Sequence, residues 1–137
     1  MTTPWLIHFF ERHPDDDPNR SVPVRDFFDA LPAKVVAEIQ AVLDAVAEAP
    51  PPAFSGGGKW EAMHGLMAGF FEIRVRAGSL NYRVFCVLER DAEDLGGSSI
   101  VAIDSLSKAK RSAAETRDYR RALGYLAEFR RRRTVLR

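Results

Sequence analysis

Residues 71–90, FEIRVRAGSLNYRVFCVLER, decide the fold. Their first part alternates between apolar side chains on one side and charged side chains on the other, Glu72, Arg74 and Arg76. A period of two is typical of a β-strand with one open face, so we predict a strand over residues 68–76. A turn at residues 77–81 then leads into a strand at residues 82–90. That strand is apolar on both faces, as expected of a strand in the middle of a sheet.

Patterns on the N-terminal side predict one strand followed by two helices. The segment WLIHFFE, residues 5–11, is rich in aromatic and β-branched side chains and predicts the first strand. Ser21 can cap a helix that has Pro23 in its first turn, and apolar side chains recur at helical spacing over residues 24–31. The same period continues over residues 32–49, which predicts a second helix and hence a helical hairpin.

Patterns on the C-terminal side complete the sheet and add a last helix. A turn at residues 91–98 leads into SIVAIDSL, residues 99–106, a strand that is apolar on both faces. Three consecutive strands joined by short turns form an antiparallel meander. Ser112 and Glu115 have the spacing of a capping box, and the apolar period after them predicts a helix as far as Phe129.

The order of these elements predicts an α+β fold. We expect a small, mostly antiparallel four-stranded sheet with an N-terminal helical hairpin and a C-terminal helix. A chain of 137 residues, 46% hydrophobic and 28% charged, fits a single domain over residues 1–137, with residues 130–137 as a frayed basic tail. These figures exclude a multidomain machine, a disulfide scaffold and a membrane-spanning protein. The single cysteine, Cys86, lies in an apolar run and is expected in the core; with no signal-peptide pattern, this predicts a cytoplasmic protein.

Charge is distributed unevenly along the chain. The formal net charge is only +1, yet residues 107–137 carry 11 basic and 3 acidic side chains, a net charge of +8. The rest of the chain is acidic. A basic end on an acidic body favours a polyanion or an acidic protein as partner, and a solvated basic helix is the alternative.

Five cations from three predicted strands are expected on one side of the sheet. A charged row cannot lie on a sheet that is buried on both faces, so the face that carries Glu72 must open to solvent or to a charged ligand. In the meander, the strand ends and turns bring together Arg74, Arg76, Arg83, Lys108 and Lys110. The competing hypothesis is that Arg74 and Arg76 simply pair with Glu72 and with acidic neighbours on the surface.

Such a cluster suits a phosphate group. Arginine grips phosphate with two parallel hydrogen bonds, and lysine adds a point charge. When a 2′-hydroxyl attacks the adjacent phosphorus of RNA, negative charge builds on the phosphoryl oxygens, and fixed cations stabilise it without a metal. No metal site is predicted, because the three histidines lack ligand spacing and the adjacent carboxylates of residues 15–17 do not match a known loop.

The chain resembles the RelE/ParE toxin superfamily, and most of all its HigB-like, phage-derived branch. Three segments carry the resemblance: Phe71-Glu-Ile-Arg74, Tyr82-Arg83-Val-Phe, and Leu106-Ser-Lys108-Ala-Lys110. The resemblance runs from about Trp5 to Phe129 and implies a RelE-like fold. It also implies the toxin of a type II toxin–antitoxin pair, a ribosome-dependent mRNA endoribonuclease that uses 2′-hydroxyl attack and needs no cofactor.

The resemblance also implies roles for individual residues and for partners. The expected catalytic residues are Arg74, Arg83, Lys108 and Glu72. The expected RNA-binding residues are Arg76 and Lys110, joined by two cations on the exposed face of the last helix, Arg117 and Arg121. The implied partners are a cognate antitoxin of the helix-turn-helix type, the ribosome and mRNA; neither membrane association nor stable DNA binding by the chain alone is expected.

Two residues depart from the RelE pattern. Glu72 stands where RelE has a lysine general base, so Glu72 either acts as the base or orients Arg74. RelE ends with a catalytic tyrosine, whereas Tyr119 lies in the predicted last helix at a spacing that indicates burial. These departures leave a second hypothesis open, a binding module without catalysis: either a ParE-like gyrase inhibitor or a family member that has lost its activity.

Overall fold

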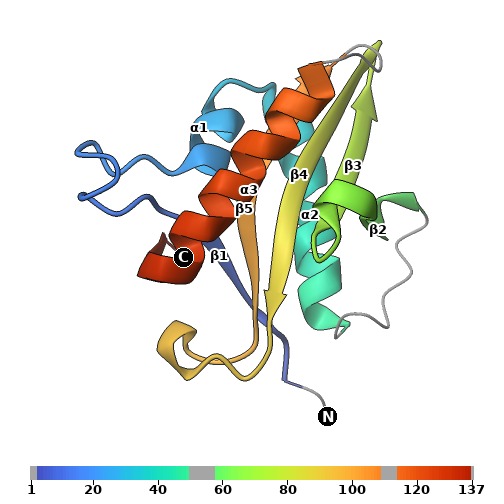
Figure 1. The fold of residues 1–137 in the computed structure, drawn as a ribbon. Helices are drawn as coiled ribbons and strands as arrows, with labels where there is room; N and C mark the ends of the chain where they lie inside the picture. The colour runs from blue at the N-terminus through green and yellow to red at the C-terminus, as the bar shows by residue number, and fades with distance from the viewer. Residues whose placement is uncertain (1–2, 50–57, 109–113, 137) are drawn as a thin grey trace.

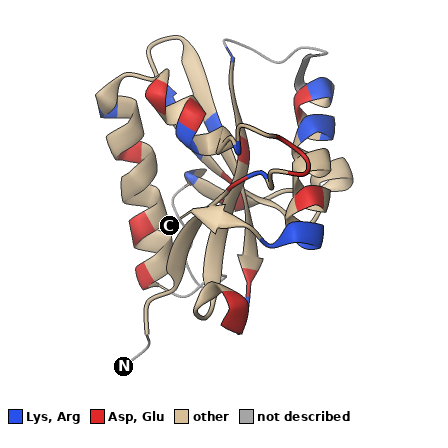
Figure 2. Ribbon diagram, turned by 90° about the vertical axis from the view of Figure 1, so that its left-hand side faces the viewer, with Lys and Arg blue, Asp and Glu red and all other residues tan. Residues whose placement is uncertain are grey.

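The computed structural model describes residues 3–49, 58–108 and 114–136, and it shows a mixed α+β fold in three layers (Figure 1). The middle layer is a six-stranded sheet made of β1 (Leu6–Phe10), β2 (Trp60–Ala62), β3 (Phe71–Ala77), β4 (Leu80–Glu89), β5 (Ser99–Lys108) and β6 (Val135–Leu136). The helices are α1 (Pro23–Asp29), α2 (Ala33–Glu48) and α3 (Ala114–Arg132), with short 3-10 turns at η2 (Gly65–Met67) and η3 (Glu93–Leu95). The helices α1 and α2 cover one face of the sheet, and α3 crosses the other (Figures 1 and 2).

The predicted meander is confirmed, since β3, β4 and β5 are neighbours and pair antiparallel. The strand order across the sheet is β2-β3-β4-β5-β1-β6. The first strand, β1, pairs parallel with β5, which is why the chain crosses over through α1 and α2 before it returns to the sheet.

The prediction of four strands is wrong, because β2 and β6 extend the sheet at its two edges. Trp60–Ala62 pairs antiparallel with β3, and Val135–Leu136 pairs antiparallel with β1. Segments of two or three residues are too short to show a period, so only their tertiary hydrogen bonds reveal them as strands.

Two apolar layers hold the helices to the sheet. On the side of α1 and α2, the fully buried side chains include Val24, Ile39, Leu43, Ile73 and Val84. On the side of α3 they include Phe10, Phe70, Phe85, Ile103 and Phe129. The central strands β4 and β5 contribute to both layers, which explains why their sequences are apolar on both faces. Cys86 is buried as predicted.

Ser21 does not cap α1, contrary to the prediction. The N-cap is Val22, and no side chain caps the helix there. The Ser21 hydroxyl instead donates a hydrogen bond of 2.6 Å to Asp17 and fixes the preceding loop. Of the predicted capping box, Ser112 and the Glu115 side chain lie outside the described residues.

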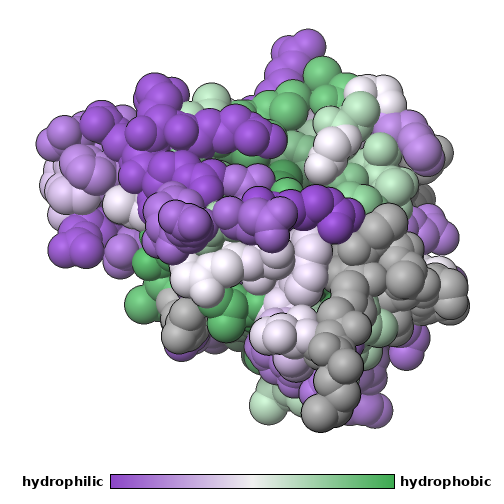
Figure 3. Space-filling model, turned by 90° about the horizontal axis from the view of Figure 1, so that it is seen from below, coloured by the Kyte–Doolittle hydropathy of each residue, from purple (hydrophilic) through white to green (hydrophobic). Residues whose placement is uncertain are grey.

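The predicted frayed tail is instead the ordered end of α3 followed by β6. Arg132 contacts Asp16 at 3.2 Å, and Arg133 contacts Asp94 at 2.9 Å and also pairs with Glu89. The view from below shows a broad hydrophilic area on its left, the side where Figure 1 places the loop of residues 13–20 (Figure 3). Arg131, Arg132 and Arg133 are thus each paired with a carboxylate within the chain. Within the described ranges, no helix combines the length and the apolar character that crossing a bilayer requires.

Candidate functional site

Three rows of paired residues cross β3, β4 and β5 on the face that carries α3. Residues opposite each other in neighbouring strands point to the same face, so the pairing register defines each row. The rows are Arg76–Asn81–Lys108, Arg74–Arg83–Leu106 and Glu72–Phe85–Asp104. Arg74, Arg76, Arg83 and Lys108 therefore occupy two adjacent rows on one face, as the sequence predicts. We call this group of four the strand cations. Lys110 lies outside the described residues.

Arg83 is the buried centre of the site. Its side chain is 10% exposed, and its Nε donates a hydrogen bond of 2.7 Å to the Glu72 carboxylate. The terminal nitrogen Nη2 pairs with the same carboxylate and donates to the Tyr119 hydroxyl at 2.8 Å. The guanidinium carbon lies 5.6 Å from the ring centroids of both Phe85 and Tyr119. Carboxylate, hydroxyl and two rings therefore hold the Arg83 side chain in one orientation.

Arg74 lies next to this centre and is half exposed. Its Nη1 is 3.5 Å from Glu61 on β2, and its Nε is 3.7 Å from Glu72. Both separations exceed a good hydrogen bond, and Arg74 and Glu61 are each about half exposed to solvent, so these pairs are weak. Arg74 therefore does pair with surface carboxylates, as the competing hypothesis expects. These contacts are solvent-exposed, and a ligand could replace them.

Arg76 and Lys108 form the outer row. Arg76 is exposed, Lys108 is half-buried, and Asn81 stands between them in the register. Glu61 and Glu72 contact Arg74 and Arg83, while Arg74 and Arg76 are exposed to solvent. A phosphodiester carries one negative charge and can pair with exposed cations of this kind.

One of the two predicted RNA-binding cations on α3, Arg121, is engaged with carboxylates and a carbonyl oxygen. Arg121 donates to Asp104 at 2.8 Å, to Asp118 at 3.0 Å and to the carbonyl oxygen of Ser105 at 2.9 Å. Burial raises the pKa of Asp104, and the hydrogen bond from Arg121 opposes that shift. Arg121 therefore anchors α3 to β5, while Arg117 is exposed one helical turn earlier.

Sequence reasoning underestimated two residues of this site. Tyr119 is half-buried as its spacing predicts, yet its hydroxyl reaches Arg83, and its ring packs edge-on against Phe85 at 5.6 Å. Glu61 belongs to the short strand β2, which no pattern revealed. A tyrosine on the inner side of an amphipathic helix is one signal that could have been used, because a buried hydroxyl usually finds a polar partner.

No family model matches the chain, and comparisons with curated proteins and with solved structures find no match either. In the part of the chain that the structure describes, no group of three His, Cys, Asp or Glu side chains is placed to hold a metal ion. The features that bear on function are therefore the geometry of the strand cations and the resemblance of the three short segments.

Proposed function

We propose that the chain is a RelE-like toxin of the HigB-like branch: the toxin of a type II toxin–antitoxin pair and a ribosome-dependent mRNA endoribonuclease. The observation that supports this most is the placement of the strand cations in two adjacent rows on one face, where Arg74 and Arg76 are exposed to solvent. The meander with helices before and after it is also compatible with a RelE-like topology.

In this proposal the exposed cations bind the scissile phosphate. Arg74 and Arg76 contact the phosphoryl oxygens as the 2′-oxygen attacks phosphorus and the bond to the 5′-oxygen breaks. Lys108 donates the proton that the departing 5′-oxygen takes up, and a base removes the proton of the 2′-hydroxyl. The products are a 2′,3′-cyclic phosphate and a 5′-hydroxyl end.

Glu72 has two possible roles, general base or orienting residue, and we assign it the second. Its carboxylate is buried and accepts the 2.7 Å hydrogen bond from Arg83, an arrangement that suits a residue that fixes the arginines. Arg83 lies beside Arg74 in the strand register, and its buried guanidinium neutralises Glu72. Tyr119 completes this support through its hydrogen bond to Arg83.

The same ion pair favours one competing function, a binding module without catalysis. Because Arg83 is held by Glu72 and Tyr119, a family member that has lost its activity could keep the fold and bind RNA or protein through the exposed cations alone. A ParE-like gyrase inhibitor belongs to the same class.

Cleavage is tested with purified protein, translating ribosomes and a defined mRNA, with mapping of the new 5′ ends. We expect cleavage that requires ribosomes and leaves 5′-hydroxyl ends. A 5′-phosphate would refute attack by the 2′-hydroxyl. Intact transcripts, together with growth arrest in cells, would support the binding module, and a supercoiling assay would then test gyrase.

Variants of residues that lie outside the apolar core link cleavage to the site. We expect Arg74→Gln, Arg76→Gln and Lys108→Gln each to lower the cleavage rate at least about tenfold, as loss of a charged contact to a transition state does. The matched control is Lys34→Gln, because Lys34 is an exposed cation on α2, on the other side of the sheet. A triple variant that cleaves as fast as the control would refute the assignment of the site.

A further inference from the structure

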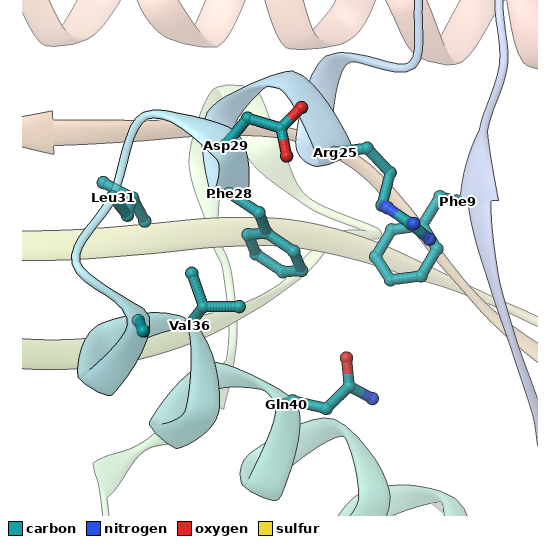
Figure 4. Close-up of a pocket in the computed structure, with 8 residues that line it drawn as sticks. Phe9, Arg25, Phe28, Asp29, Leu31, Val36 and Gln40 are labelled. Carbon is teal, nitrogen blue, oxygen red and sulfur yellow. The ribbon is translucent and has the colours of Figure 1, made fainter.

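A groove of about 540 Å³ lies between α1, α2 and β1, on the face of the sheet opposite the strand cations. Figure 4 shows side chains from these three elements around one space. Its apolar lining includes Phe9, Phe28, Leu31 and Val36, and its polar lining includes Arg25 and Gln40. Its volume is in the range of small-molecule sites, whose walls are mostly apolar with a few placed polar groups.

The apolar part of the groove is fixed by the core beneath it. Phe9 is buried, and its ring meets the Phe28 ring edge-on at 5.8 Å. Phe28 and Leu31 pack against the core cluster on this side of the sheet, which includes the fully buried Val24 of α1. The groove is therefore formed before any ligand binds, and a ligand would not have to order its walls.

Arg25 supplies the polar end of the groove. Its guanidinium carbon lies 5.4 Å from the Phe9 ring centroid, so the side chain is held by a ring and not by a carboxylate. Across residues 3–49, 58–108 and 114–136, Arg25 makes no ion pair, although it is exposed. A guanidinium next to an apolar floor matches a ligand that has one anionic head and an apolar body.

Asp29 limits the charge of that ligand. It lines the same groove one helical turn after Arg25, and it too makes no ion pair in the described part of the chain. Its negative charge disfavours a second negative charge on a ligand, which excludes phosphate monoesters and dicarboxylates as good fits.

We propose that this groove binds a small monocarboxylic acid with an apolar, preferably aromatic, body. The carboxylate pairs with Arg25, and the body packs on Phe28, Leu31 and Val36. The inference is independent of RNA cleavage, because these residues lie on the other side of the sheet from Arg74, Arg76 and Lys108.

Binding is tested on the full chain with 3-phenylpropionate as the probe, by calorimetry and by amide chemical shifts. We expect saturable binding in the millimolar range or tighter, with the largest shifts in α1 and the first half of α2. The neutral analogue 3-phenylpropan-1-ol and the ring-free propionate should each bind at least about tenfold more weakly, since each lacks one of the two contacts.

Two variants separate a lost contact from a lost fold. Arg25→Gln, at an exposed position, should weaken 3-phenylpropionate at least about tenfold, while Arg120→Gln, an exposed arginine on α3, should leave binding unchanged. Val36→Thr keeps the side-chain shape and should weaken binding severalfold. Equal affinity for the alcohol, no effect of Arg25→Gln, or shifts confined to the α3 face would each overturn the proposal. The last result would assign the carboxylate to the strand cations and would leave the proposed nuclease site intact.

Discussion

Replacing Arg83 with methionine should lower the free energy of unfolding by about 3–5 kcal/mol, the cost of leaving a buried charge without its partner. The Glu72 carboxylate is only 9% exposed and depends on Arg83 for its close contacts. After the substitution, the cation that still contacts Glu72 among the described residues is Arg74, whose Nε lies 3.7 Å away on a side chain that is 52% exposed. The Tyr119 hydroxyl also loses its 2.8 Å partner.

The double variant Glu72→Leu/Arg83→Met removes both charges and should recover most of this loss, because apolar side chains replace a buried ion pair at little net cost. Urea unfolding followed by tryptophan fluorescence gives the four free energies of the cycle, and we expect a coupling energy of at least about 2 kcal/mol. Arg76→Met is the matched control; Arg76 is exposed on the neighbouring strand β3, and its loss should cost within about 0.5 kcal/mol. A loss below about 1 kcal/mol for Arg83→Met, or a double variant as unstable as the sum of the single ones, would refute the role of this pair in the fold.

Three further outcomes are expected. A hydrogen bond from Arg133 lowers the pKa of Asp94. The stability that this pair contributes is therefore present above about pH 4 and is lost as the pH falls through the folded-state pKa. In a plot of unfolding free energy against pH, Asp94→Asn should flatten the decrease at acid pH. Cys86 is buried, and burial raises the pKa of its thiol, so a thiol reagent should modify it no faster than the chain unfolds. Modification of the folded protein at the rate of an exposed cysteine would contradict this. Ile39 is fully buried between α2 and the sheet, so Ile39→Ala should lower the free energy of unfolding by about 2–5 kcal/mol in the same urea assay. Val36 is only half-buried, and Val36→Thr should lower it by under about 1 kcal/mol.

The sequence predicts best the elements whose patterns are long enough to repeat. β3 alternates over seven residues, and β4 and β5 carry apolar side chains on both faces, so their type and order follow from local chemistry. The placement of Arg74, Arg76, Arg83 and Lys108 on one face follows for the same reason, because short turns join these antiparallel strands.

What the sequence could not predict depends on contacts between distant segments. From the sequence, the adjacent aspartates at positions 15–17 predict a solvated loop, and the C-terminal arginines predict a surface for a polyanion. In the fold Asp16 meets Arg131 and Arg132, 115 and 116 positions away, and each group neutralises the other. No local pattern contains that pairing. It lowers the positive charge that the C-terminal end of α3 can offer to an anion.

The pairing of charges also decides which cation a phosphate can reach. Arg83 compensates the charge of Glu72, which would otherwise be buried without a partner. The short hydrogen bonds from Arg83 to Glu72 and Tyr119 are therefore costly to exchange for contacts with a phosphate. Arg74 has the opposite character: it is half exposed and lies 3.5 Å and 3.7 Å from two carboxylates, so a phosphate oxygen can replace either contact at little cost. If RNA binds here, Arg74 should therefore dominate the affinity, while Arg83 should act mainly by keeping Glu72 from repelling the substrate. Glu61→Gln follows as a direct check, because it frees Arg74 from its partner on β2 without touching the buried pair, and it should tighten RNA binding; weaker binding by Glu61→Gln would show that the phosphate does not compete for Arg74.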